Sequence, residues 1–152
     1  MAKITLITGG ARSGKSTFAE ELAAKKGDKI LYVATAKAID VEMRDRIKRH
    51  RERRPDSWDT LEAYKGLSSL LPQSSPNYDG ILLDCITIMS TNIIFDEPAM
   101  LQAEIAFEEM LRAEELLMAE IDEFIACFPN LQSDLIMVTN EVGMGLVPEY
   151  PL

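Results

Sequence analysis

Residues 9–16 read Gly-Gly-Ala-Arg-Ser-Gly-Lys-Ser and stand between an apolar, β-rich run at residues 3–8 and a helix-forming run at residues 17–23. A strand, a glycine-rich turn and a helix in this order are the setting of a phosphate-binding loop. In such a loop the backbone N–H groups point at phosphate oxygens, and the N-terminus of the following helix adds partial positive charge. The segment therefore predicts an α/β fold that binds a nucleotide.

Each residue of this segment is a candidate nucleotide contact. The ammonium group of Lys15 would bind the β- and γ-phosphates, and the hydroxyl of Ser16 is the predicted ligand of Mg²⁺. The alternative, an ordinary Gly/Ser turn, is disfavoured by the strand and helix patterns on either side. The predicted phosphate-binding residues are Gly9, Gly10, Ala11, Arg12, Ser13, Gly14, Lys15 and Ser16.

Composition limits the remaining classes of function. A chain of 152 residues with 47% hydrophobic side chains can bury one core, so we expect a single domain over residues 1–152. The formal net charge of −9 argues against a general nucleic-acid binder, which would need a basic surface. The absence of a signal-peptide pattern and of a membrane-spanning apolar stretch predicts a cytoplasmic protein. Cys85 and Cys127 lie in apolar surroundings without metal-ligand spacing, so we expect buried free thiols.

The chain alternates strand-like and helix-like patterns. We expect strands at residues 3–8, 29–34, 58–63, 80–84 and 134–139, and helices at 17–23, 40–54, 66–71, 86–95 and 98–127. Asp40 is the expected N-cap of the second helix, and residues 72–77 read as a loop. The helix over 98–127 would be amphipathic, with an apolar stripe that forms core or a subunit contact. The alternation predicts a three-layer α/β fold of the P-loop NTPase type with a mostly parallel sheet.

Asp84 ends the apolar run at residues 80–84 and precedes a predicted helix. In nucleotide-binding folds a carboxylate at this position, downstream of the phosphate loop, holds Mg²⁺ or its water. The alternative is that Asp84 is the N-cap of the helix. The two roles are compatible, and the upstream loop favours the metal-linked one. Ser16 and Asp84 are therefore the candidate metal ligands.

His50, the single histidine of the chain, lies in a basic segment. Residues 43–55 hold seven basic side chains and only two acidic ones, and on a helix Arg46, His50, Arg53 and Arg54 would share a face. A cationic neighbourhood disfavours the imidazolium form, so we expect a neutral imidazole that could act as a nucleophile. The arginines could then neutralise phosphate oxygens. The alternative is an ordinary solvated basic surface.

Further motifs occur in order along nearly the whole chain. After the loop come Ala34-Thr35-Ala36 and an Arg-Ile-x-x-His-x-x-x-Arg-Pro pattern from Arg46 to Pro55. Trp58-x-Thr60-x-Glu62, Leu83-Asp84-Cys85-Ile86-Thr87 and a Val-Thr-Asn-Glu-Val-Gly-Met-Gly-x-Val-Pro segment at 138–148 follow. Together these motifs resemble those of the adenosylcobinamide kinase / adenosylcobinamide-phosphate guanylyltransferase family.

The resemblance implies a cytoplasmic transferase with two activities, a kinase and a nucleotidyltransferase. It would phosphorylate the aminopropanol hydroxyl of adenosylcobinamide with ATP or GTP, then transfer GMP from GTP to adenosylcobinamide phosphate, giving adenosylcobinamide-GDP. Family members carry the GMP on a histidine, and the matching residue is His50, so His50 and Lys15 are the catalytic candidates. The resemblance further implies a homotrimer and nucleotide contacts at Ala34, Thr35, Ala36, Arg51, Glu52, Arg53, Arg54, Glu62 and Asp84.

The sequence stops at Pro151-Leu152, whereas family members continue with a further helix and strand, so we expect the domain to lack these two elements. Two other functions stay open. A generic P-loop small-molecule or nucleoside-monophosphate kinase needs only Lys15, Ser16 and Asp84. A nucleotide-binding regulatory module is the third possibility, although the lack of an Asn-Lys-x-Asp motif disfavours a Ras-like switch.

Overall fold

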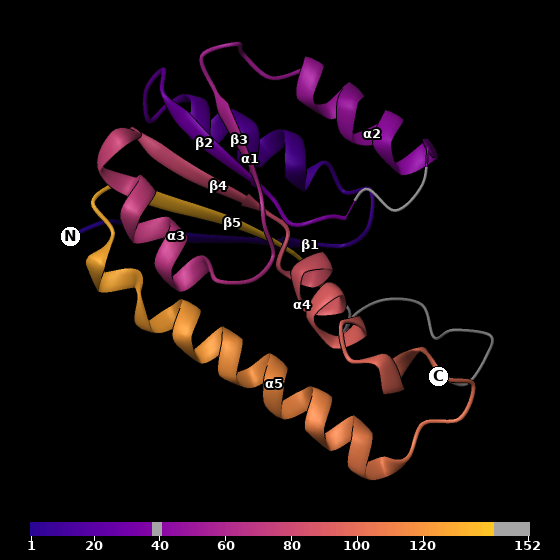
Figure 1. The fold of residues 1–152 in the computed structure, drawn as a ribbon. Helices are drawn as coiled ribbons and strands as arrows, with labels where there is room; N and C mark the ends of the chain where they lie inside the picture. The colour runs from indigo at the N-terminus through magenta and orange to yellow at the C-terminus, as the bar shows by residue number, and fades with distance from the viewer. Residues whose placement is uncertain (38–40, 142–152) are drawn as a thin grey trace.

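The structure, a computed structural model, describes residues 1–37 and 41–141 (Figure 1). Five strands form one sheet, and every strand pair in it is parallel. The strands are β1 (Ile4–Gly9), β2 (Ile30–Ala34), β3 (Asp59–Glu62), β4 (Gly80–Asp84) and β5 (Asp134–Asn140), in the spatial order β1-β5-β4-β2-β3. The helices are α1 (Lys15–Ala24), α2 (Val41–Glu52), α3 (Leu67–Ser74), α4 (Ile86–Phe95) and α5 (Phe107–Ala126).

Helices cover both faces of the sheet (Figure 1). On one face, Ala19 and Ala23 of α1 pack with alternate residues of β2, β4 and β5. On the other face, α3, α4 and α5 supply Leu71, Met89 and Phe124 to a second apolar cluster. The inner strands β2 and β4 are buried on both faces, which explains why their sequences are apolar without alternation. The predicted α/β fold of the P-loop NTPase type is confirmed.

Three of the predicted helices have the wrong bounds. The segment at residues 98–127 is not one helix, because a short 3₁₀ helix at Pro98–Leu101 is followed by extended backbone at Gln102 and at Ala106 before α5 begins. Helix α3 runs through Pro72, where the sequence predicted a loop. Its end is secured by buried Ser75, whose backbone N–H bonds to the carbonyl of Leu71 and whose hydroxyl accepts from the Gln132 N–H at 3.0 Å.

Helix α2 also ends earlier than expected, at Glu52. The Arg54 N–H bonds to the carbonyl of Arg51, a tightened last turn before Pro55. The expected N-cap Asp40 lies outside the described residues, as do residues 142–145 of the predicted loop after the last strand. The remaining strands and helices lie close to their predicted bounds. Cys85 and Cys127 are both buried and free, as expected.

Candidate functional site

A cavity of ≈ 190 Å³ lies at the carboxyl ends of β2 and β4, the edge at which open parallel sheets bind ligands. It brings together segments that are far apart in the sequence: the phosphate loop, the ends of two strands, helix α2 and the start of α4. Its lining residues are Ser16, Tyr32, Ala34, Ala36, Arg46, Ile47, His50, Arg54, Asp84, Cys85 and Ile88.

The phosphate loop connects β1 to α1 and has the backbone geometry that its sequence predicts. Gly14 adopts a φ of 83°, the left-handed region that favours glycine, and no side chain caps the helix that follows it. The first N–H groups of α1 are therefore left for a ligand. Lys15 donates from Nζ to the carbonyl of Gly10 at 3.0 Å, so its ammonium group lies against the loop. A Cβ on Gly9 would lie 2.8 Å from Oγ of Ser13, so any larger residue there would require the Ser13 side chain to move.

Asp84 lies at the end of β4 and is not the helix N-cap. Cys85 has that position, because its Sγ accepts from the N–H of Ile88 at 3.4 Å. Among the described residues, the Asp84 carboxylate accepts one hydrogen bond, from the hydroxyl of Tyr32 to Oδ2 at 2.8 Å. Burial and the Asp84 carboxylate both raise the pKa of Tyr32, so this phenol stays a donor.

Ser16 and Asp84 face the same cavity and offer a hydroxyl and a carboxylate oxygen. Oxygen ligands of this kind suit Mg²⁺, which takes one or two protein groups and completes its coordination with substrate phosphates and water. Within residues 1–37 and 41–141 there is no cluster of three or more His, Cys, Asp or Glu that could hold a metal unaided. The pair therefore fits a cation that arrives with a nucleotide.

Arg54 supplies a buried positive charge to the cavity. Its side chain is 7% exposed, and its guanidinium lies over the ring of Tyr32, 3.6 Å from the centroid. Within the described part of the chain, its Nη1 is buried without a hydrogen-bond partner. Burial raises the pKa of nearby Glu20, and the charges of Arg53 and Arg54 oppose that shift. A buried guanidinium with an unused donor at a cavity wall is suited to an anionic ligand.

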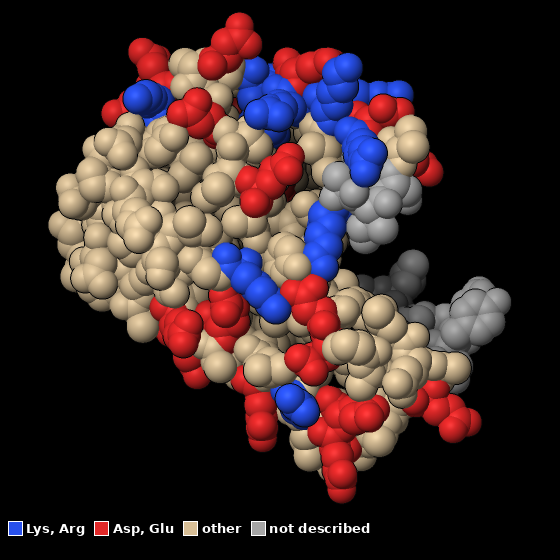
Figure 2. Space-filling model, viewed as in Figure 1, with Lys and Arg blue, Asp and Glu red and all other residues tan. Residues whose placement is uncertain are grey.

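His50 comes from α2 and faces this cavity together with Arg46, one helical turn earlier. Arg53 lines a neighbouring hollow on α2 that also includes Arg46, Arg49 and His50. Figure 2 shows Lys and Arg gathered over α2, whereas Asp and Glu predominate over α5. The protein thus carries a local basic surface beside the phosphate loop although its net charge is −9.

The other predicted nucleotide contacts are divided among several places. Ala34 and Ala36 line the main cavity, and Glu62 lies in an adjacent hollow of ≈ 420 Å³ that shares Ala36. Arg51 lines a separate hollow with Arg54 and Trp58. Glu52 is exposed at the end of α2. Thr35 is fully buried: its hydroxyl donates to the carbonyl of Cys85 at 2.7 Å and accepts from the Cys85 N–H at 2.9 Å. Its side chain therefore supports the turn between β4 and α4.

Sequence reasoning did not assign four of the cavity residues to the site: Tyr32, Ile47, Cys85 and Ile88. Tyr32 stands in an apolar strand and reads as core, which is correct for its ring. The available signal was its hydroxyl, because a buried tyrosine normally finds a hydrogen-bond partner. Ile88 gives no such signal, since an apolar residue in the first turn of a helix is ordinary.

The all-parallel sheet and the loop between β1 and α1 define a P-loop NTPase-type α/β protein. The sequence profile of the family described as cobinamide kinase / cobinamide phosphate guanyltransferase matches residues 5–152, and the chain belongs to this family. No helix among the described residues is long and apolar enough to cross a membrane.

Characterised relatives give the same result. The chain is 41% identical over 152 residues to the bifunctional adenosylcobalamin biosynthesis protein CobU of Escherichia coli, an alignment that covers 97% of this chain and 80% of the relative. The protein of the same name in Salmonella typhimurium is 42% identical over 154 residues, with the same coverage. CobP of Pseudomonas aeruginosa, also called a bifunctional adenosylcobalamin biosynthesis protein, is 42% identical over 144 residues, covering 94% and 74%.

Proposed function

We propose that this protein is a bifunctional enzyme of cobalamin biosynthesis. It phosphorylates adenosylcobinamide with ATP or GTP and then transfers GMP from GTP to adenosylcobinamide phosphate, giving adenosylcobinamide-GDP. The observation that carries the proposal is that His50 faces the same cavity as Ser16 of the phosphate loop and Asp84. Membership of the family supports it as well.

In the kinase step, the protein positions a phosphate chain and neutralises its charge. The loop N–H groups and Lys15 hold the β- and γ-phosphates, with Lys15 exchanging the Gly10 carbonyl for phosphate oxygens. Mg²⁺, when bound, supplies further charge neutralisation, and Ser16 and Asp84 are the residues that would hold it. The acceptor hydroxyl attacks the γ-phosphorus, the bond from that phosphorus to the β–γ bridging oxygen breaks, the nucleoside diphosphate leaves, and the hydroxyl proton passes to water.

In the guanylyl step, an imidazole nitrogen of His50 attacks the α-phosphorus of GTP. A nitrogen–phosphorus bond forms, the bond between the α-phosphorus and the bridging oxygen breaks, and pyrophosphate leaves. The phosphate of adenosylcobinamide phosphate then attacks the same phosphorus and releases His50. Arg46 and Arg54 line the cavity beside His50, where they can stabilise the charge on the non-bridging oxygens.

The volumes of the main cavity and the adjacent hollow indicate which part of a nucleotide each would hold. A cavity of ≈ 190 Å³ is small beside the ~300–1,000 Å³ of a whole small-molecule site, so it takes the phosphate chain. The adjacent hollow of ≈ 420 Å³, which contains Glu62 and shares Ala36, is where the rest of the nucleotide would extend.

The proposal includes a homotrimer in the cytoplasm. Its support in the structure is a set of exposed large apolar side chains on α5, which a subunit contact would cover. They are Phe107, Met110, Leu111, Leu116, Met118 and Ile125. Light scattering on the purified chain tests the assembly, and a monomer at micromolar concentration would refute the trimer.

The deciding experiment traps the covalent intermediate. GTP labelled at the α-phosphate should leave acid-labile, alkali-stable label on the wild-type protein, and His50→Asn should abolish it. Lys48→Gln is the matched control, because Lys48 is exposed on the same helix and does not line the cavity. Added adenosylcobinamide phosphate should release the label as adenosylcobinamide-GDP. Label that persists in His50→Asn would refute the role of His50.

The same preparation distinguishes the simpler kinase. An enzyme that needs only Lys15, Ser16 and Asp84 would transfer the γ-phosphate to a non-corrinoid acceptor and release no pyrophosphate from GTP. Pyrophosphate release that depends on His50 would exclude that alternative.

A further inference from the structure

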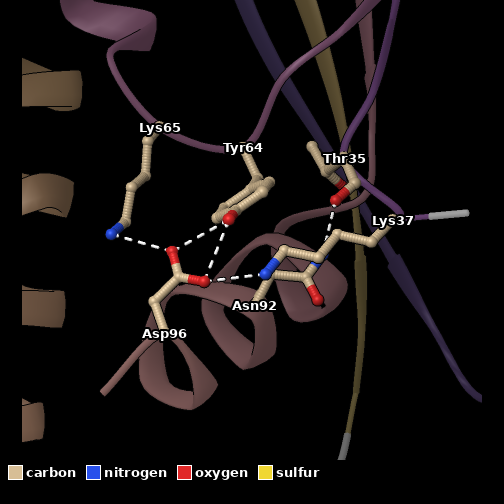
Figure 3. A network of polar contacts seen from close by, with 6 residues as sticks. All are labelled: Thr35, Lys37, Tyr64, Lys65, Asn92 and Asp96. Atoms are coloured by element: carbon tan, nitrogen blue, oxygen red, sulfur yellow. Dashed lines mark hydrogen bonds and ion pairs between the residues drawn. The ribbon is translucent and has the colours of Figure 1, made fainter. Parts of the chain in front are cut away.

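Asp96 joins three side chains at the C-terminal end of α4 (Figure 3). Lys37 donates to Oδ1 at 2.7 Å, and Lys65 forms an ion pair with Oδ2 at 2.8 Å. The hydroxyl of Tyr64 lies within hydrogen-bond distance of both oxygens, at 3.0 and 2.9 Å. Lys37 also lies over the Tyr64 ring, 4.7 Å from its centroid. One carboxylate therefore holds side chains from two separate loops.

These loops are the continuations of β2 and β3, neighbouring parallel strands in which Ala34 is paired with Glu62. The backbone joins the same strand ends, because the Ala63 N–H donates to the carbonyl of Ala34 at 3.1 Å. Lys37 follows the cavity residue Ala36, and Tyr64 follows Glu62 by two positions. Asp96 thus fixes the spacing of the two segments that line the adjacent hollow, the first of which also lines the main cavity through Ala36.

Helix α4 holds the turn after β2 at further points along its length (Figure 3). The side-chain amide of Asn92 donates to the carbonyl of Thr35 at 2.7 Å. At the start of the helix, Cys85 exchanges two hydrogen bonds with the Thr35 hydroxyl. The Thr35 N–H donates to the carbonyl of Asp84 at 3.2 Å. Asp96 is the last in this series of contacts and the one that extends it to β3.

The charges of the network strengthen one another. Hydrogen bonds from Lys37 and Lys65 lower the pKa of Asp96, and their bonds to Asp96 raise the pKa of both lysines, so all three groups stay charged near neutral pH. A single exposed ion pair contributes little to stability. A carboxylate shared by several donors on converging segments gains more, because one group orders them all.

We propose that Asp96 is a positioning residue of the nucleotide pocket. Asp96 itself lines neither the main cavity nor the adjacent hollow. It acts through Lys37 and Tyr64, which line the adjacent hollow and hold Ala36 and Glu62 at the spacing a nucleotide needs. The role in nucleotide binding rests on the proposed function, whereas the tie between the two strand ends stands on geometry alone.

Asp96→Asn tests the proposal, because asparagine keeps the size and one acceptor but removes the charge that both lysines share. Asp134→Asn is the matched control: Asp134 also binds a lysine, Lys26 at 2.9 Å, and a backbone N–H, that of Lys3 at 2.8 Å. It lies at the start of β5, the opposite end of the strands from the cavity. Both variants should lower the thermal midpoint by similar amounts.

The two readouts are hydrogen exchange and GTP affinity. In Asp96→Asn the Ala63 and Thr35 amides should exchange about fivefold faster, and the Kd for GTP should rise about fivefold, the factor expected for loss of one modest interaction. Neither quantity should change in Asp134→Asn. Unchanged exchange at Ala63, or equal changes in the control variant, would overturn the proposal. If the wild-type protein binds no GTP, the proposed function fails, and the exchange measurement still decides the role of Asp96.

Discussion

Replacing Tyr32 with phenylalanine separates two tasks of a single side chain. The hydroxyl donates to Asp84 at 2.8 Å, whereas the ring lies under the guanidinium of Arg54. Tyr32→Phe removes the hydroxyl and keeps the ring. The Asp84 carboxylate would lose the one hydrogen bond that it accepts among the described residues, and Arg54 would keep its stacking partner.

The size of the effect follows from burial. Tyr32 is 6% exposed, and a hydrogen bond from such a site to a charged carboxylate contributes about 1.5–3 kcal/mol. Asp84 lines the cavity and regains part of this by binding water, so we expect the free energy of unfolding to fall by about 1.5 kcal/mol. For a domain of this size that corresponds to a thermal midpoint lowered by about 3–6 °C. The Mg²⁺ concentration for half-maximal kinase activity should rise about tenfold, because Asp84 is no longer held in one orientation.

Tyr78→Phe is the matched control. The Tyr78 hydroxyl donates to Oδ2 of Asp59 at 2.7 Å, a bond of the same chemistry at an exposed site. Its loss should lower the midpoint by less than about 2 °C, because water replaces the partner, and should leave the Mg²⁺ requirement unchanged. Calorimetry and Mg²⁺ titration of γ-phosphate transfer measure both quantities. Equal midpoints for the two variants, or an unchanged Mg²⁺ requirement in Tyr32→Phe, would refute the reasoning.

Two further predictions concern Arg54 and Asp96. Arg54→Lys keeps the charge but removes the planar group over Tyr32. We expect labelling of His50 by α-labelled GTP to slow about tenfold, whereas γ-phosphate transfer should change less. Equal slowing of both reactions would contradict this expectation. The pKa of Asp96 is lowered in the folded protein, so its stabilising contribution is present above the ordinary carboxyl pKa of 3.8 and is lost as the pH falls further. The stability difference between wild type and Asp96→Asn should therefore be largest near pH 7 and shrink toward pH 3 in urea unfolding, and a constant difference would count against the charged network.

The parts of the fold that the sequence predicted correctly depend on local signals. The loop at residues 9–16 is contiguous, and the buried strands β2 and β4 are apolar runs bounded by turn residues. The wrong bounds arise where distant contacts decide. Buried Ser75, bonded to the backbone of Gln132, secures the end of the helix through Pro72. The non-helical segment at residues 102–106 interrupts an apolar pattern that continues on both sides of it.

In the site, too, local sequence signals identify some residues, and contacts between distant segments determine others. His50 and Asp84 stand in recognisable motifs, and the structure brings both to one cavity with Ser16. Tyr32 and Asp96 act across 52 and 59 residues of sequence, through partners that become neighbours only in the strand order β1-β5-β4-β2-β3. No local pattern contains that order. Residues that position the predicted groups are for this reason harder to find in one sequence than the groups themselves.

The end of α2 explains why the two proposed activities should respond differently to changes at Arg54. None of the side chains of α2 that the structure describes belongs to either apolar cluster, so these side chains do not fix the helix through packing in the core. Arg54 lies two residues after the end of α2 and is buried against Tyr32 of β2, which ties this end of the helix to the sheet. His50 lies about one turn before that tie, whereas Lys15, Ser16 and Asp84 are carried by the loop and strand ends of the sheet itself. Loosening Arg54 should therefore displace His50, the proposed nucleophile of the guanylyl step, and leave the proposed phosphate-binding residues of the kinase step where they are.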